Sequence, residues 1–295
     1  IDAGPLTEWA REGARVLVAP TLLGIPGDLA GLEAACRSCG IFLIDDAAQS
    51  MGAKVGHRPV GSFGQAGIFS FGRGKAAAGW GWGLLSLRDD SLGDAAEARY
   101  RPLEVQSAAE TWRQGMILRL APLLQSPRVF RWLASLPFLQ IGATVYDPSF
   151  PIRRAGGTME GRLAAALDGL ATRNGIRIRN ARTWFDLLGG LPVDCLGPRD
   201  PVGSAAIFTR FGILFPDGAS RAEALRRLRP AGVQGTGLYP RALADLPEIQ
   251  PHRVGNRPVP AARQLAETLL VLPTHGQIRA EDFQSAAAAL HRMFA

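Results

Sequence analysis

The fold is decided by residues 16–46, which read VLVAPTLLGIPGDLAGLEAACRSCGIFLIDD. The apolar run Val16-Leu17-Val18-Ala19 predicts a short buried strand, and the turn from Gly24 to Asp28 opens a predicted amphipathic helix. A second apolar run, Ile41-Phe42-Leu43-Ile44, predicts another strand that stops at Asp45-Asp46. A strand, a helix and a strand at this spacing form a βαβ unit, which implies a parallel sheet covered by helices.

Two more strands are predicted at Gly67 to Phe71 and at Gly83 to Leu87, separated by the glycine-rich stretch Gly72 to Gly83. Polar residues at the strand ends therefore gather at one edge of the sheet. In open α/β sheets, this edge is where ligands bind. With 295 residues, of which 47% are apolar, the chain can form one large domain and a smaller one.

The second half of the chain predicts a smaller α/β domain. Thr158 to Leu188 reads as one long helix or two in tandem, and Ile207 to Phe215 as an apolar run. Further helices are predicted at Ala222 to Leu228, Val259 to Leu270 and Glu281 to Met293. We expect residues 1–155 to form the large domain, with a hydrophobic helical insert at about 112–145. Residues 156–295 are expected to form the linking helix and the small domain.

The insert at about 112–145 is apolar but contains arginines and prolines, which argue against a simple membrane span. It predicts a pair of short amphipathic helices. These helices either pack within the protein or its dimer, or lie on a membrane surface as a peripheral contact.

Composition narrows the class of partner. The net charge of +7 comes from arginines spread along the chain rather than from a basic arm, so no nucleic-acid partner is expected and an anionic small substrate fits. The odd count of three cysteines indicates a reducing, cytoplasmic location. Cys36 and Cys39 form a C-x-x-C, but no second Cys/His pair nearby completes a zinc site, and the four histidines do not cluster, so no metal is expected. The first residues, Ile1 to Pro5, read like the middle of a longer protein.

Three segments carry the chemistry. They are Leu43-Ile44-Asp45-Asp46-Ala47-Ala48-Gln49-Ser50, then Pro59-Val60-Gly61-Ser62-Phe63-Gly64, then Ile68-Phe69-Ser70-Phe71-Gly72-Arg73-Gly74-Lys75. An acid at a strand end, followed by a strand, a glycine-rich turn and a lysine, is what a pyridoxal phosphate site requires.

Each of these residue types has a physical role at such a site. A carboxylate, here Asp46, must keep the pyridine nitrogen protonated. A lysine, here Lys75, must bind the cofactor aldehyde covalently and later move a proton. The hydroxyl of Ser70 can bind phosphate oxygens, and the glycines around Lys75 let the backbone approach a flat ring closely.

The motifs Asp46-Ala47-Ala48-Gln49 and Ser70-Phe71 to Lys75 resemble those of the DegT/DnrJ/EryC1/StrS sugar aminotransferases. The resemblance runs to the closing stretch from Leu269 to His275. It implies the aspartate-aminotransferase type of fold (fold type I), a mainly parallel sheet with helices on both faces plus a smaller C-terminal α/β domain. It also implies that Asp46 pairs with the pyridine nitrogen, Gln49 lies near the ring hydroxyl, Ser70 binds phosphate and Lys75 holds pyridoxal 5'-phosphate.

The resemblance implies a homodimer that transfers an amino group from a donor such as glutamate to a nucleotide-linked keto sugar. Family members with histidine at the lysine position act as dehydratases, so Lys75 favours transamination. The stretch from Ile141 to Arg154, with the insert before it, looks like a subgroup found with exopolysaccharide and exosortase gene clusters. Surface or exopolysaccharide biosynthesis is the process that this implies.

The sequence departs from the family at three places. Family members begin with roughly a quarter more chain, which carries a phosphate-binding loop and a stacking aromatic. Gly79-Trp80-Gly81-Trp82-Gly83 replaces a glycine-rich stretch after the lysine, and Arg153-Arg154 stands where an asparagine reaches the neighbouring subunit's phosphate. Arg153 would take over that contact. These departures leave open a second hypothesis, a catalytically inactive truncated homologue that binds a partner or a membrane.

Overall fold

The computed structural model describes most of the chain, namely residues 4–72, 74–77, 81–113, 115–116, 152–156, 159–197 and 204–294. The described residues form two compact units. The first contains those up to 116 together with 152–178 and 204–209, and the second contains 179–197 and 210–294. Most of the predicted insert at about 112–145 lies outside the described residues. The domain boundary predicted near residue 155 stays a prediction.

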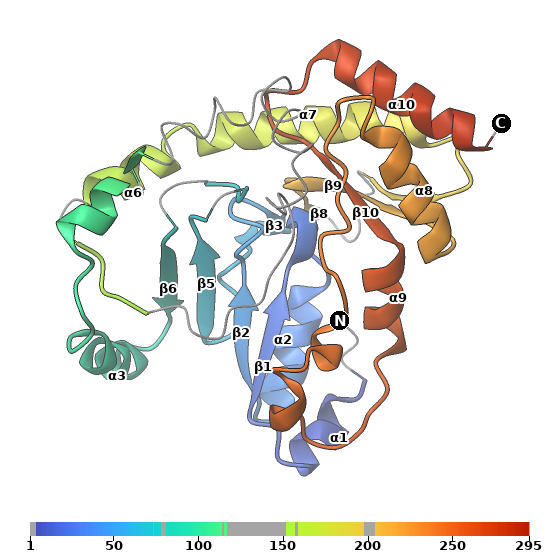
Figure 1. Cartoon of the computed structure of the whole chain (residues 1–295). Helices are drawn as coiled ribbons and strands as arrows, with labels where there is room; N and C mark the ends of the chain where they lie inside the picture. Colours follow the sequence, from blue (N-terminus) through green and yellow to red (C-terminus); the bar gives the residue numbers. More distant parts are fainter. Residues whose placement is uncertain are drawn as a thin grey trace. The chain divides into compact units, whose positions relative to one another are not determined.

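The first unit is built on a four-stranded sheet (Figure 1). Its strands are β1 (Val16–Pro20), β2 (Phe42–Asp46), β5 (Ala66–Ser70) and β6 (Gly83–Leu87), adjacent in this order. β1, β2 and β5 are parallel, and β6 is antiparallel to β5. Helix α2 (Leu29–Ser38) connects β1 to β2 and begins after Asp28, whose carboxylate accepts a hydrogen bond from the Gly31 amide at 2.8 Å. The predicted βαβ unit is thus confirmed.

Shorter elements complete the first unit. They are α1 (Leu6–Arg11), η1 (Leu22–Gly24), β3 (Lys54–Val55), β4 (Arg58–Pro59), α3 (Asp90–Tyr100), α6 (Met159–Leu167) and β8 (Ser204–Ala205). β3 lies between β4 and β8 in a small antiparallel sheet. Helix α7 (Leu170–Leu188) contributes residues 170–178 to the first unit and 179–188 to the second.

The loop between β4 and β5, residues 60–65, is attached to the sheet by hydrogen bonds to Asp45 of β2. Side chains alternate along β2, so Asp45 points to the same buried side as Leu43. Asp45 is fully buried, and its Oδ2 accepts hydrogen bonds from the amides of Gly61 at 2.5 Å and Phe63 at 3.1 Å. Burial raises the pKa of Asp45 above its usual value, and the two amides oppose this rise.

The same loop is also attached to helix α2, through the carboxylate of Glu33. Its carboxylate accepts two hydrogen bonds from the Arg58 guanidinium, at 2.7 and 2.8 Å, and one from the Gly64 amide at 2.7 Å. The Arg58 guanidinium also lies 4.1 Å from the centre of the Phe63 ring, a cation–π geometry. The bonds from Arg58 above all, with that from Gly64, lower the pKa of Glu33 from 4.5 to about 2.

Glycines allow the loop to contact the strands directly. A Cβ added at Gly67 of β5 would lie 1.9 Å from the carbonyl oxygen of Gly61. A Cβ at Gly64, whose φ is +69°, would lie 2.3 Å from the carbonyl oxygen of Leu43. Because these contacts leave no space for a side chain, glycine is required at both positions.

The second unit contains a three-stranded antiparallel sheet of β10 (Leu269–Pro273), β9 (Arg210–Leu214) and β7 (Asp194–Leu196), in this order. Its helices are α8 (Gly218–Leu228), α9 (Pro260–Thr268) and α10 (Ala280–Phe294), with short turns η4 (Leu243–Asp245) and η5 (Gln250–His252). The core includes the fully buried Trp184, whose ring centre lies 4.4 Å from that of Phe283. Trp184 Nε1 donates a hydrogen bond to the carbonyl oxygen of Pro273 at 2.8 Å.

The structure refines two predicted elements. Within the stretch predicted to be helical from Thr158 to Leu188, the described residues form two tandem helices, α6 and α7. The helix predicted at Val259 to Leu270 ends at Thr268, and the buried run that follows it is strand β10. Periodicity alone does not distinguish a short buried strand from the end of a helix. Within the described ranges, no helix is long and apolar enough to cross a membrane.

We predict that Glu33→Gln lowers the free energy of unfolding at pH 7 by about 1.5–3 kcal/mol, because it removes hydrogen bonds to a charged carboxylate whose folded pKa of about 2 lies below the unfolded value. The carboxylate stabilises the fold fully above its unfolded pKa of 4.5, and this contribution is lost as the pH falls toward 2. Urea unfolding of both proteins at pH 7, 5 and 3.5 should therefore show a difference that shrinks with acidity.

The matched control is Glu97→Gln, which removes an exposed ion pair with Arg101 of 3.0 Å. Its effect should stay below about 1 kcal/mol. A Glu33→Gln difference that does not change between pH 7 and 3.5 would contradict the assignment.

We also predict that Asp45→Ala costs about 2–5 kcal/mol, since it leaves the buried amides of Gly61 and Phe63 without their acceptor. Asp45→Asn keeps an acceptor oxygen and should cost much less. Because the folded pKa of Asp45 is raised, wild-type stability falls as the pH rises above the unfolded pKa. The stability of Asp45→Asn relative to wild type should thus improve from pH 4 to pH 7, which thermal unfolding at several pH values can measure.

Candidate active site

The loops that follow β1, β2 and β5 lie at the same end of the sheet, because these three strands are parallel. The Leu23 amide, in the loop after β1, donates a hydrogen bond to Oε1 of Gln49 at 3.1 Å, in the loop after β2. Asp46 pairs in register with Ile68, two residues before Ser70. The structure therefore brings Asp46, Gln49 and Ser70 to one edge of the sheet, as the sequence predicted.

Asp46 differs from its neighbour Asp45 in environment. It is the last residue of β2 and is half-buried on the face opposite to Asp45. Its Oδ1 accepts a hydrogen bond from the Ala48 amide at 3.0 Å, which fixes the direction of the carboxylate. The two adjacent acids thus face opposite sides of the sheet, and only Asp46 is placed to contact a ligand at its edge.

Ser70 and Lys75 flank the backbone of Gly72. The hydroxyl of Ser70 accepts a hydrogen bond from the Gly72 amide at 3.2 Å. A Cβ built at Gly72 would lie 3.3 Å from Ser70 Oγ and 3.8 Å from Lys75 Cγ. Lys75 is half-buried, and its amide donates to the carbonyl oxygen of Gly72 at 3.3 Å. A hydroxyl and a lysine side chain on one tight turn fit a ligand that carries both a phosphate and an aldehyde.

Arg153 lies in a separate set of charges in the first unit. Its guanidinium pairs with Glu110 and, at 3.8 Å, with Glu104. The hydrogen bond from Arg153 above all lowers the pKa of Glu110, so this carboxylate stays charged. The role of Arg153 at a phosphate stays a prediction. Trp82 packs against the core of the first unit, and Trp80 lies outside the described residues.

The residues that hold these loops could not be identified from local sequence pattern. Asp45 reads as part of a turn, although it is a buried acceptor within β2. Arg177 of α7 donates a hydrogen bond to the main chain of Ala76, 101 residues earlier, and Asn174 lies one helical turn before it. Asn174 and Arg177 are three residues apart, so the sequence predicts that they lie on one face of a helix. It does not reveal which distant segment they bind.

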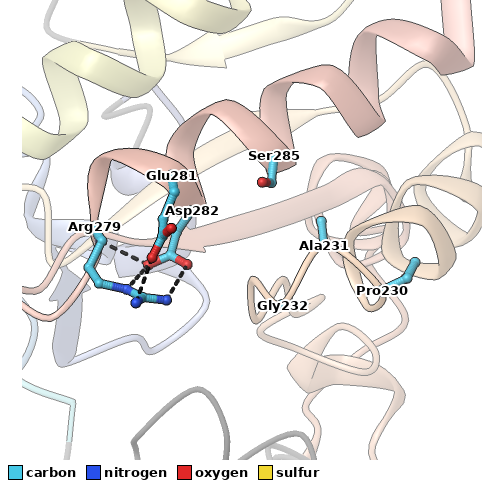
Figure 2. A pocket seen from close by; sticks show the side chains of 7 residues that line it. All are labelled: Pro230, Ala231, Gly232, Arg279, Glu281, Asp282 and Ser285. Carbon is cyan, nitrogen blue, oxygen red and sulfur yellow. Dashed lines mark hydrogen bonds and ion pairs between the residues drawn. The ribbon is translucent and has the colours of Figure 1, made fainter.

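The second unit has a cavity of about 290 Å³ between the turn at residues 230–232 and the first turn of α10 (Figure 2). Its charged groups pair with one another, since Arg279 contacts Glu281 at 2.5 Å and Asp282 at 3.4 Å. Ser285 completes the lining on the α10 side. These residues include no lysine, so the cavity offers no amine for an aldehyde.

Comparison with solved structures establishes the fold class. The aminotransferase of Helicobacter pylori involved in pseudoaminic acid biosynthesis superposes with a TM-score of 0.72 at 16% identity, covering 100% of this chain and 70% of that chain. The GDP-4-keto-6-deoxy-D-mannose-3-dehydratase of E. coli, with bound hydrated pyridoxal phosphate, superposes with a TM-score of 0.67 at 19% identity, covering 98% and 70%. The chain thus has the predicted fold of pyridoxal-phosphate-dependent sugar aminotransferases, fold type I. This fold accommodates a dehydratase as well.

Sequence comparison relates the chain to known aminotransferases. A UDP-N-acetyl-3-dehydro-alpha-D-glucosamine 3-aminotransferase of Acidithiobacillus ferrooxidans is 27% identical over 284 residues, which are 94% of this chain and 64% of that protein. The chain therefore spans less than two thirds of the length of this relative. The sequence model of the DegT/DnrJ/EryC1/StrS aminotransferase family matches residues 9–116. This segment carries Asp46, Gln49, Ser70 and Lys75, and it is similar to the DegT/DnrJ/EryC1/StrS aminotransferase family.

Proposed function

We propose that this chain provides the pyridoxal 5'-phosphate site of an aminotransferase that acts on a nucleotide-linked keto sugar. The observation that carries the proposal is the placement of Ser70 and Lys75 on either side of Gly72, next to the strand that ends in Asp46. Lys75 stands at the position where lysine favours transamination over dehydration. The fold alone does not decide between these reactions, so the proposal depends on this amine.

Each residue has a role that follows from its chemistry. When bound, the cofactor supplies an electron sink for the substrate carbon that loses a proton. The Lys75 amine would hold the cofactor through its aldehyde and, once released, would move a proton between the substrate carbon and the adjoining carbon of the cofactor. The Asp46 carboxylate keeps a proton on the pyridine nitrogen through its negative charge. The Ser70 hydroxyl donates a hydrogen bond to a phosphate oxygen.

Gln49 and Arg153 have supporting roles in the proposal. Gln49 Oε1 accepts a hydrogen bond from the Leu23 amide. The amide nitrogen of the same side chain is the proposed donor to the ring hydroxyl. Arg153 would contact the cofactor phosphate of a second subunit in a homodimer. To do so its guanidinium would have to exchange its pairing with Glu110 for the phosphate.

The substrate class is supported by the Acidithiobacillus ferrooxidans relative, whose name specifies a UDP-linked keto sugar. The net charge of +7 suits the diphosphate of such a substrate. Glutamate is the proposed amino donor, and surface or exopolysaccharide biosynthesis is the proposed process. We place the protein in the cytoplasm, in keeping with the odd count of three cysteines in the sequence.

A second candidate function is the binding of a partner polypeptide without catalysis. The outermost described strands of the four-stranded sheet carry exposed apolar side chains. On β1, Val16 and Val18 are 54% and 49% exposed, and Leu85 on β6 is 53% exposed. Apolar residues on an outer strand favour pairing with another strand. Whether Lys75 reacts selectively with the cofactor separates the two candidates.

We predict that pyridoxal phosphate added to the purified chain gives a visible absorption band that borohydride fixes onto Lys75. The sequence makes the mapping unambiguous, because Lys54 and Lys75 are its only two lysines. Lys75→Ala should abolish the band. Lys54→Ala, which removes the exposed amine on β3, is the matched control and should leave it unchanged. Peptide mass spectrometry locates the reduced adduct.

A band that survives in Lys75→Ala, or equal labelling of both lysines, would rule out the proposed site. It would leave the partner-binding candidate.

We further predict that the chain loaded with pyridoxal phosphate converts L-glutamate and a UDP-linked 3-keto sugar to 2-oxoglutarate and the amino sugar. The amino group and its proton pass to the keto carbon, and the keto oxygen passes to the glutamate skeleton through water. Lys75→Ala should lower the rate by at least about 100-fold, whereas Lys54→Ala should not. Coupled detection of 2-oxoglutarate measures the rate. Loss of water from the sugar without 2-oxoglutarate would indicate a dehydratase instead.

A further inference from the structure

The turn that carries Lys75 is held by a buried arginine. Arg177 of α7 is 8% exposed. Its Nη2 donates a hydrogen bond to the carbonyl oxygen of Lys75 at 3.1 Å, and its Nη1 donates to that of Ala76, also at 3.1 Å. Removing a guanidinium from water is unfavourable unless its donors are satisfied. Each of the two carbonyl oxygens accepts from one of these donors, so the position of the turn and the burial of the arginine depend on each other.

Asn174, one helical turn before Arg177, connects this arginine to the loop after β2. Asn174 is 6% exposed, and its Oδ1 accepts a hydrogen bond from Arg177 Nη1 at 3.1 Å. Its Nδ2 donates to the carbonyl oxygen of Met51 at 3.0 Å, two residues after Gln49. A Cβ at Gly52 would lie 2.6 Å from Asn174 Nδ2, so the loop approaches the amide closely.

We propose that Arg177, oriented by Asn174, is a positioning residue for Lys75. One turn of α7 binds the main chain of both loops that carry proposed cofactor residues, the loop with Gln49 and the turn with Lys75. The spacing between these loops is therefore set by α7 and not by the short turns themselves. A planar guanidinium contacts two carbonyl oxygens at fixed angles, which an ammonium group does not reproduce. This inference rests on the proposed function, because the positioned group is the amine that binds the cofactor.

The test compares Arg177→Gln with Arg173→Gln in the full chain. Arg173 lies one turn earlier on α7 and donates to the carbonyl oxygens of Asp168 and Ala166, outside the Lys75 turn. Arg173→Gln therefore removes the same charge from the same helix and is the matched control.

The first measurement is amide hydrogen exchange, which needs no cofactor. Arg177→Gln should speed exchange about 10- to 100-fold in residues 72–77 and 51–53, as expected for the loss of hydrogen bonds from a charged donor. Arg173→Gln should leave these segments at the wild-type rate. If Arg177→Gln does not fold, Asn174→Ala replaces it, with the largest expected change in residues 51–53.

The second measurement is the ratio of borohydride-fixed pyridoxal phosphate on Lys75 to that on Lys54. Lys54 is an internal reference in the same molecule, because general loosening of the fold does not favour Lys75 over an exposed lysine. Arg177→Gln should lower the ratio at least about tenfold. Arg177→Lys should give a ratio between those of Arg177→Gln and the wild type, since one ammonium group cannot reproduce the two-pronged geometry of the guanidinium.

The inference is overturned if Arg177→Gln leaves both the exchange of residues 72–77 and the labelling ratio unchanged. It is equally overturned if Arg173→Gln changes both by the same amount. A wild-type ratio near one would instead refute the proposed function, while the exchange rates would still decide whether Arg177 holds the turn.

Discussion

A carboxylate inside the sheet, that of Asp45, determines how the first unit can be assembled. Its Oδ2 binds the amides of Gly61 and Phe63, which fixes the loop between β4 and β5 above the core. Glu33 binds the same loop from α2 through Arg58 and the Gly64 amide. Because β5 begins directly after this loop, its register with β2 depends on both acids. That register in turn sets Ser70 relative to Asp46.

The alternation of side chains along β2 gives the adjacent acids Asp45 and Asp46 different environments. One points into the core and binds main-chain amides, and the other points to the opposite face at the end of β2. A shift of one residue in β2 would exchange them. The buried acid would then lack its amides, and the loop after β2 would lose its link to Leu23 through Gln49.

The parts of the fold that depend on local pattern could be predicted from the sequence. The apolar runs of β1 and β2, the helix between them and the turn around Lys75 all form from neighbouring residues. The role of Asp45 could not be predicted, because its partners lie 16 and 18 residues away in a loop. The contact between Arg177 and the Lys75 turn is still more distant in sequence. Strand β10 was missed for a different reason, since its continuous apolar run follows α9 directly.

The motif Pro59-Val60-Gly61-Ser62-Phe63-Gly64 was read as part of the chemistry, yet its glycines serve backbone contact. The Gly61 carbonyl packs directly on Gly67, and Gly64 packs directly on Leu43. In a library of random variants selected for activity, these glycines would tolerate replacement as poorly as Lys75. The two classes would differ in the amount of folded protein recovered. Intolerance to replacement at this loop would therefore reflect failed assembly of the sheet. A low yield of folded protein would distinguish such variants from those that fold but lack a reacting group.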